Sequence, residues 1–257
     1  MPDWLYHLPV VWMGLVVCVV TALVAAVVYG AAMALAARGR APMLKAISPV
    51  MLTPLAVLFG LIVAFICSQV WSDAQRANAA VAREASALRT VVILAANFPG
   101  ETEARVRALV RRHVQDAVDQ EWPAMARQEA KLGMVTAEAS EVLELTLSVR
   151  PQNDVQVLAQ REMLAALQSA NDARRERIVI SRSSIDWVKW AVVYLFAILI
   201  LVTIAFVHID NSGTAAIALA LFSLGVVACV VLIASHNRPF TGEISVGPEL
   251  LLQVMPQ

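Results

Sequence analysis

Four long apolar runs alternate with polar segments along the 257-residue chain. They cover residues 10–36, 50–70, 190–207 and 214–235, and their lengths suit helices that cross a bilayer, which need about 20 apolar residues. Most of the charged residues lie between the second and third runs, in segments with helical periodicity. The pattern predicts an all-α, polytopic membrane protein with four transmembrane helices and a helical insert between the second and third.

The second run has no helix-breaking residue where its apolar part ends. It begins near Pro54 and turns polar at Trp71, and apolar residues then recur every three or four positions as far as Val92. A break follows at residues 97–100, Asn-Phe-Pro-Gly. We therefore expect one continuous helix to about Ala96, half in lipid and half in water.

The remaining boundaries follow from turn residues and from the same periodicity. Further insert helices are predicted at 101–131, with Pro123 as a kink, at Thr136–Leu147 and at Asp154–Ser183. The chain then divides into four parts. These are a first transmembrane hairpin (1–70), the soluble helical insert (71–186), a second transmembrane hairpin (187–236) and an interfacial tail (237–257).

Positive residues near the membrane ends predict which side the insert faces. The loop after the first run holds three, Arg38, Arg40 and Lys45, whereas the insert and tail hold nine. Since Lys and Arg are enriched in cytoplasmic segments, both termini and the insert are expected in the cytoplasm. The nine are Arg76, Arg83, Arg89, Arg174, Arg175, Arg177, Arg182, Lys189 and Arg238.

Composition argues against most other classes of protein. The formal net charge is zero, so no nucleic-acid partner is expected. Cys18, Cys67 and Cys229 lie within apolar runs and predict free thiols rather than a metal site. Glu121, beside Trp122, is interpreted as part of a solvated helix face rather than as a catalytic carboxylate. We expect no enzyme activity, no cofactor and no metal.

Glu84 is the exception among the charged residues. It lies on the apolar face of its helix, where an unpaired carboxylate is costly. Arg174, Arg175 and Arg177 lie about as far before the third run as Glu84 lies after the second. Two antiparallel helices leaving the membrane together would bring them level. The preferred interpretation is a structural ion pair, and a functional ring of charges is the alternative.

The apolar runs contain no acidic residue and no central basic residue, which argues against a proton-coupled transporter. A pore gated by an apolar constriction needs no charge, because it closes by dewetting. Leu58, Ile62 and Ile66 are spaced i, i+4, i+8 and would line such a neck. A helix packed in an ordinary bundle has the same spacing, so both interpretations stay open.

Small residues recur every four positions in the first run, at Ala22, Ala26, Gly30 and Ala34. In lipid, such a stripe lets two helix backbones approach closely. An alanine-rich helix with accidental spacing explains it equally well.

A sparse set of residues spread over most of the chain is similar to a bacterial family of membrane proteins described as bestrophin-like. The family is defined by sequence and implies no activity by itself. The residues that carry the resemblance are Trp71, Glu84-Ala85 with Leu88, Pro99, Glu121-Trp122, the run Arg174-Arg175-Glu176-Arg177, and Pro239-Phe240 with Gly242.

A more distant resemblance is to bestrophins, pentameric ion channels with four spans and a cytoplasmic helical region. The stretch Pro54–Leu88 is similar to their pore-lining second span, which would make Leu58, Ile62 and Ile66 the neck. Two departures stand out: residues 68–72, Ser-Gln-Val-Trp-Ser, replace a polar, arginine-bearing segment, and the tail has no acidic cluster.

The resemblance implies a homo-oligomeric channel for small ions in the bilayer of the bacterial inner membrane, a pentamer if it assembles as bestrophins do. The alternative is a non-conducting membrane scaffold whose helical insert binds a partner protein.

Overall fold

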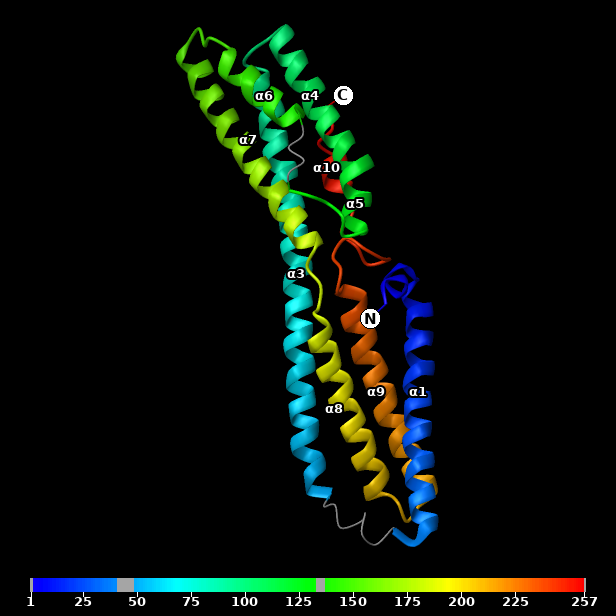
Figure 1. Ribbon diagram of the computed structural model, residues 1–257. Coiled ribbons are helices and arrows are strands. Elements are labelled where there is room, and N and C mark those ends of the chain that lie inside the picture. Colours follow the sequence, from blue (N-terminus) through cyan, green and yellow to red (C-terminus); the bar gives the residue numbers. More distant parts are fainter. Residues whose placement is uncertain (1, 41–48, 133–136, 257) are drawn as a thin grey trace. The chain divides into compact units, whose positions relative to one another are not determined.

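The computed structural model describes residues 2–40, 49–132 and 137–256. In this part of the chain the structure is helical and contains no strand (Figure 1). Four of its helices are long and apolar enough to cross a membrane. The predicted fold class is therefore confirmed. Lys45 of the first loop and Thr136, the expected start of a helix, lie outside the described residues.

The described chain forms two compact units, residues 1–71 with 184–237 and residues 72–183 with 238–257. Helix α3 runs through both without interruption. It covers 44 residues, which at 1.5 Å per residue is about 66 Å. No proline or glycine follows Gly60 until Pro99, so nothing in the sequence ends the helix where its apolar part stops.

The first unit holds the four candidate membrane helices. In it α1 packs against α9 and α8, and α8 packs against α9, while Phe59 of α3 has its ring 6.0 Å from that of Phe222 on α9. The helices are α1 (Val10–Leu35), α3 (Leu52–Ala95), α8 (Trp187–Val207) and α9 (Ser212–His236), with a 3-10 turn at Asp3–His7 before α1.

Polar and aromatic side chains connect the helices of this unit at one end. The side chain of Asn237 is buried; its Oδ1 accepts from the Ile185 backbone at 2.8 Å and its Nδ2 donates to the Tyr6 hydroxyl at 2.9 Å. These bonds join the segments before α1, before α8 and after α9. Beside them, Trp71 stacks on His236 with ring centroids 5.7 Å apart. Such side chains are typical of the level where a helix leaves the membrane.

The second unit is a bundle with its own apolar core. Asn153 begins α7, because its side chain accepts from the Gln156 backbone N–H at 2.9 Å. The elements are the end of α3, α4 (Glu101–Asp116), a π-helical turn (Ala117–Glu121), α5 (Trp122–Ala126), α6 (Ala137–Ser148), α7 (Asp154–Ser181) and the short α10 (Glu249–Leu252).

The tail differs from the interfacial segment expected from the sequence. Phe240 and Leu251 are buried in the core of the second unit, and the carbonyl of Pro256 accepts from Arg111 at 2.9 Å. Leu251 is fully buried and belongs to the same apolar core as Val106 of α4 and Met125 of α5. The short apolar segment that suggested contact with the bilayer is used inside the protein.

Candidate functional site

Arg177 of α7 lies at the centre of a buried cluster of charged side chains in the second unit. Its Nε donates to Oε2 of Glu84 at 2.8 Å, and its Nη2 donates to Oε1 of Glu84 at 3.1 Å and to Oε2 of Glu121 at 2.8 Å. Glu84 and Arg177 are fully buried. Charges without solvent are tolerated only when each has its partner, so this pairing fixes α3 against α7.

A second arginine completes the cluster. Both Nε and Nη2 of Arg174 donate to Oε1 of Glu121, the first at 2.7 Å. Glu121 therefore bridges the two arginines, which lie one turn apart on α7. The four side chains carry two positive and two negative charges. We call Glu84, Glu121, Arg174 and Arg177 the Arg177 cluster.

Two consecutive side chains reach this cluster at the end of the π-helical turn Ala117–Glu121. A π-helical turn holds more residues than an α-helical one and shifts the following residues around the axis. Glu121 and Trp122 both face inward, with exposures of 6% and 9%, and Met125 lies one turn later at 0%. The Met125 sulfur lies 3.5 Å from Nη1 of Arg177.

Trp122 covers the other side of the guanidinium. The carbon Cζ of Arg177 lies 4.3 Å from the centroid of the Trp122 ring, a cation–π contact. Phe240 of the tail meets the same ring edge-on, with centroids 6.0 Å apart, and the indole N–H donates to the carbonyl of Val246 at 3.1 Å. The tail thus holds Trp122 over the cluster.

Burial and pairing act in opposite directions on the central pair. Burial alone raises the pKa of Glu84, but the charge of Arg177 and hydrogen bonds from His113 and Arg177 outweigh it and hold the pKa below its ordinary value. Burial likewise lowers the pKa of Arg177, and Glu84 and Glu121 raise it above the ordinary value. His113 Nε2 lies 3.4 Å from Oε1 of Glu84. Both central groups are therefore charged at neutral pH.

The structure brings together only part of the ion pair proposed from the sequence. Glu84 meets Arg177, Arg174 bonds Glu121 instead, and Arg175 is exposed. The interpretation of Glu121 as part of a solvated face was wrong, because its side chain is buried in the cluster. The missed signal was its spacing, four residues after Ala117 and four before Met125, in line with the apolar face.

Most residues that carried the family resemblance lie in or around this cluster. Phe240 packs on Trp122, and Pro239 is buried beside it. Gly242 has φ of +92°, a backbone conformation that side chains disfavour and that turns the tail towards the bundle. Trp71 is separate and stacks on His236 in the first unit.

The three proposed neck residues of α3 have different surroundings in the first unit. Leu58 is 48% exposed, Ile62 is half-buried, and Ile66 is 5% exposed and packs in the core of the bundle. The exposed apolar surface of α3 instead continues from Leu58 to Leu61 and Phe65, which are 50% and 72% exposed.

The sequence matches the model of the bestrophin-like domain over residues 17–251. The match includes most of the first candidate span, the other three spans, the insert with the Arg177 cluster, and most of the tail. The chain belongs to the bestrophin-like family. No curated protein matches the sequence.

Solved structures of a bestrophin homologue share the fold of this family member. Two crystal structures of single-substitution variants of a bacterial bestrophin homologue from Klebsiella pneumoniae are similar to it, with TM-scores of 0.69 and 0.61. Sequence identity is 12% and 13%; the alignments cover 94% and 95% of this chain and 97% and 99% of the homologue. The similarity therefore extends over spans, insert and tail, and the chain is a membrane protein of bestrophin-like fold.

Removing the cluster's central charge should destabilise the fold strongly. Replacing Arg177 by Met leaves two buried carboxylates without their shared partner, and we expect a loss of about 3–5 kcal/mol in the free energy of unfolding. The matched control is Arg175→Met on the exposed face of the same turn, where a change within about 0.5 kcal/mol is expected. Denaturant unfolding of the purified protein in detergent measures both. Equal effects would contradict the buried pairing.

The Glu84 pKa predicts acid sensitivity. A carboxyl whose pKa is lower in the folded than in the unfolded state adds stability above the unfolded value, about 4.3, and this is lost as pH falls through the folded pKa. Wild-type protein should therefore lose more stability between neutral pH and about pH 3 than Glu84→Gln. Thermal unfolding of the two proteins over this range measures the difference. Parallel curves would contradict the assignment.

Proposed function

We propose that this protein is a homo-oligomeric ion channel of the bacterial inner membrane, with the membrane part of α3 facing the pore. The observation that carries the proposal is the fold, which matches a bacterial bestrophin homologue over nearly the whole of both chains. Bestrophins, which the sequence resembles, are pentameric channels lined by their second span. A pentamer is accordingly the proposed assembly, and small ions are the proposed cargo.

The chemistry of α3 supports an apolar gate. Residues 52–70 contain no ionisable side chain other than the thiol of Cys67, so an aqueous path along this face would close by dewetting. A neck residue must also be free of its own protomer's core in order to face a central axis. Leu58 meets this requirement, Ile62 meets it in part, and Ile66 is enclosed in the bundle. We therefore place Leu58 at the neck, with Leu61 and Phe65 on the same exposed surface.

The second unit and both termini are proposed to lie in the cytoplasm. Nine Lys and Arg residues of the insert and tail, against three in the loop after α1, support this orientation.

A membrane scaffold remains the second candidate function, and exposed apolar residues on the insert favour it. Val155 and Leu158 at the start of α7 are 64% and 59% exposed, and Leu147 at the end of α6 is 61% exposed. Side chains of this kind on a soluble surface are typical of protein contacts.

Ion flux through liposomes containing the purified protein tests the channel. Leu58→Thr places a hydroxyl on the proposed neck, which lowers the cost of wetting it, so flux should rise several-fold over wild type. The matched control is Leu221→Thr on α9, where the leucine is 67% exposed in the first unit. This control should conduct like wild type. Absence of flux from all three proteins would contradict the channel and leave the scaffold.

Cysteine labelling tests the orientation. Glu144→Cys on α6 and Ser212→Cys at the start of α9 place exposed thiols in the insert and in the turn between the last two spans. An odd number of spans separates the two positions, so they lie on opposite sides of the membrane. A membrane-impermeant maleimide should label Ser212→Cys in intact spheroplasts and Glu144→Cys only after lysis. The reverse result would place the insert outside.

A further inference from the structure

Lys189 of α8 is a half-buried positive charge at the end of the membrane unit where α3 turns polar. Its ammonium Nζ donates to the side-chain Oε1 of Gln69 on α3 at 2.7 Å. Because Gln69 is a neutral amide, this bond holds the ammonium in place without compensating its charge. Lys189 lies in the first turn of α8, and residues 190–207 carry no charge. The charge therefore lies at the edge of the apolar part of the unit.

The neighbouring carboxylates do not neutralise Lys189. Among the described residues, the lysine side chain bonds only Gln69. Asp186 precedes α8, but its side chain neither bonds to the start of the helix nor forms an ion pair with Lys189. Asp73 and Arg76, the next charged residues along α3, bond each other at 2.6 Å, so their charges cancel. The charge of Lys189 is thus left uncompensated.

Gln69 connects this charge to the exposed surface of α3 that is proposed to face the pore. It follows Phe65 by four residues, or about one turn, and Leu58 by eleven, or about three turns. All three residues therefore lie on one side of the helix. Leu58 and Phe65 are exposed, and Gln69 is half-buried. Followed toward the insert, the apolar surface ends at an amide that holds a lysine.

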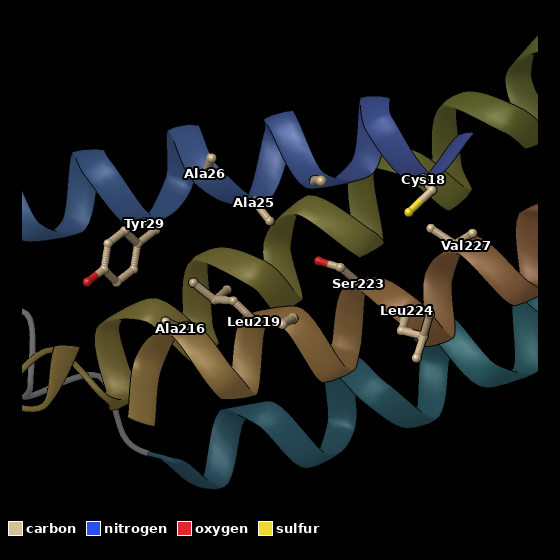
Figure 2. A pocket seen from close by; sticks show the side chains of 11 residues that line it. Cys18, Ala25, Ala26, Tyr29, Ala216, Leu219, Ser223, Leu224 and Val227 are labelled. Atoms are coloured by element: carbon tan, nitrogen blue, oxygen red, sulfur yellow. The ribbon is translucent and has the colours of Figure 1, made fainter. Parts of the chain in front are cut away.

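A groove inside the protomer has no comparable charge. Ala22 and Ala26, from the small-residue stripe of the first span, line a space of about 350 Å³ between α1 and α9 (Figure 2). The lining residues, all within the described chain, are uncharged. Such surroundings are costly for an ion that has left water. The exposed surface of α3, by contrast, has a charge beside it that can act on a passing ion.

We propose that Lys189, held by Gln69, is the residue that makes the conduit favour anions over cations. This role rests on the proposed function as a channel, because an oligomer would repeat the lysine as a ring around the axis. Rings of Lys or Arg favour anions in pores. Apolar walls of low dielectric, such as the surface of Leu58 and Phe65, concentrate the field of a nearby charge. An apolar neck alone does not distinguish the sign of an ion, so the preference comes from the charge at its end.

Reversal potentials of the purified protein in planar bilayers, under a potassium chloride gradient, give the chloride-to-potassium permeability ratio. Wild type should favour chloride, and Lys189→Gln should lower the ratio by roughly fivefold, the effect of one unit charge a few ångströms from an ion in water. Lys189→Arg keeps the charge and should keep the ratio. The matched control is Lys131→Gln, at an exposed lysine of the insert, which should retain the wild-type ratio.

A second variant neutralises the same charge from the other helix, so a folding defect in one variant does not affect the other. Gln69→Glu keeps the shape of the side chain and places a carboxylate on the ammonium, and it should lower the ratio as Lys189→Gln does. The double variant retains only the negative charge and should favour potassium. Raising the salt from about 0.01 M to about 1 M shortens the range of a charge roughly tenfold and should bring the wild-type ratio toward one.

The results distinguish the role of Lys189 from the channel itself. Conduction with an unchanged ratio in both Lys189→Gln and Gln69→Glu, or a wild type that favours potassium, would overturn the role and leave the channel. Absence of conduction from every protein would overturn both. Thermal unfolding with added phosphatidylglycerol gives a further outcome. If Lys189→Gln loses stabilisation by this lipid while its permeability ratio is unchanged, the lysine faces lipid headgroups and the role is overturned.

Discussion

The positive charge of Arg177 is buried where water cannot reach it, and the second unit is built around this constraint. A single carboxylate would balance the charge but leave guanidinium hydrogens without acceptors, so Glu84 and Glu121 share it. Glu121 in turn requires Arg174. The two carboxylates come from two other elements, and the requirement therefore joins α3, α7 and the π-helical turn. Replacing such a cluster by apolar residues can be neutral, whereas removing one member cannot.

The helices were predicted well because the signals for a helix lie within the helical segment itself or directly beside it. The spans, the continuation of α3 and the break at residues 97–100 follow from apolar periodicity and from glycine and proline positions, and the helix bounds agree within a few residues. The same reasoning located Glu84, since a carboxylate on an apolar face must have a partner.

The details of the cluster were beyond local reasoning. Arg174, Arg175 and Arg177 occupy one turn of α7, and the rotation of that helix decides which of them faces inward. Burial of Ala170, Ala173 and Ile178 sets that rotation, and it leaves Arg175 outside. Glu121 was missed because it was interpreted by its charge, although its spacing, four residues after Ala117 and four before Met125, places it on the apolar face. The tail was misplaced for a related reason, since a short apolar segment suits a bilayer surface and a protein core equally.

The contrast between the two halves of α3 explains why the family motifs concentrate on one of them. A buried ion cluster demands particular side chains, because only an arginine presents five donors in a fixed plane and only a carboxylate accepts them with opposite charge. An apolar neck demands only size and hydrophobicity, and leucine, isoleucine or phenylalanine satisfies it equally. Sequence resemblance is therefore carried by Glu84, Glu121, Trp122 and the arginines of α7, which hold the soluble bundle together. The apolar surface of α3 that is proposed to face ions has no such distinctive residues. Its position follows from the exposure of Leu58, Leu61 and Phe65 in the folded first unit.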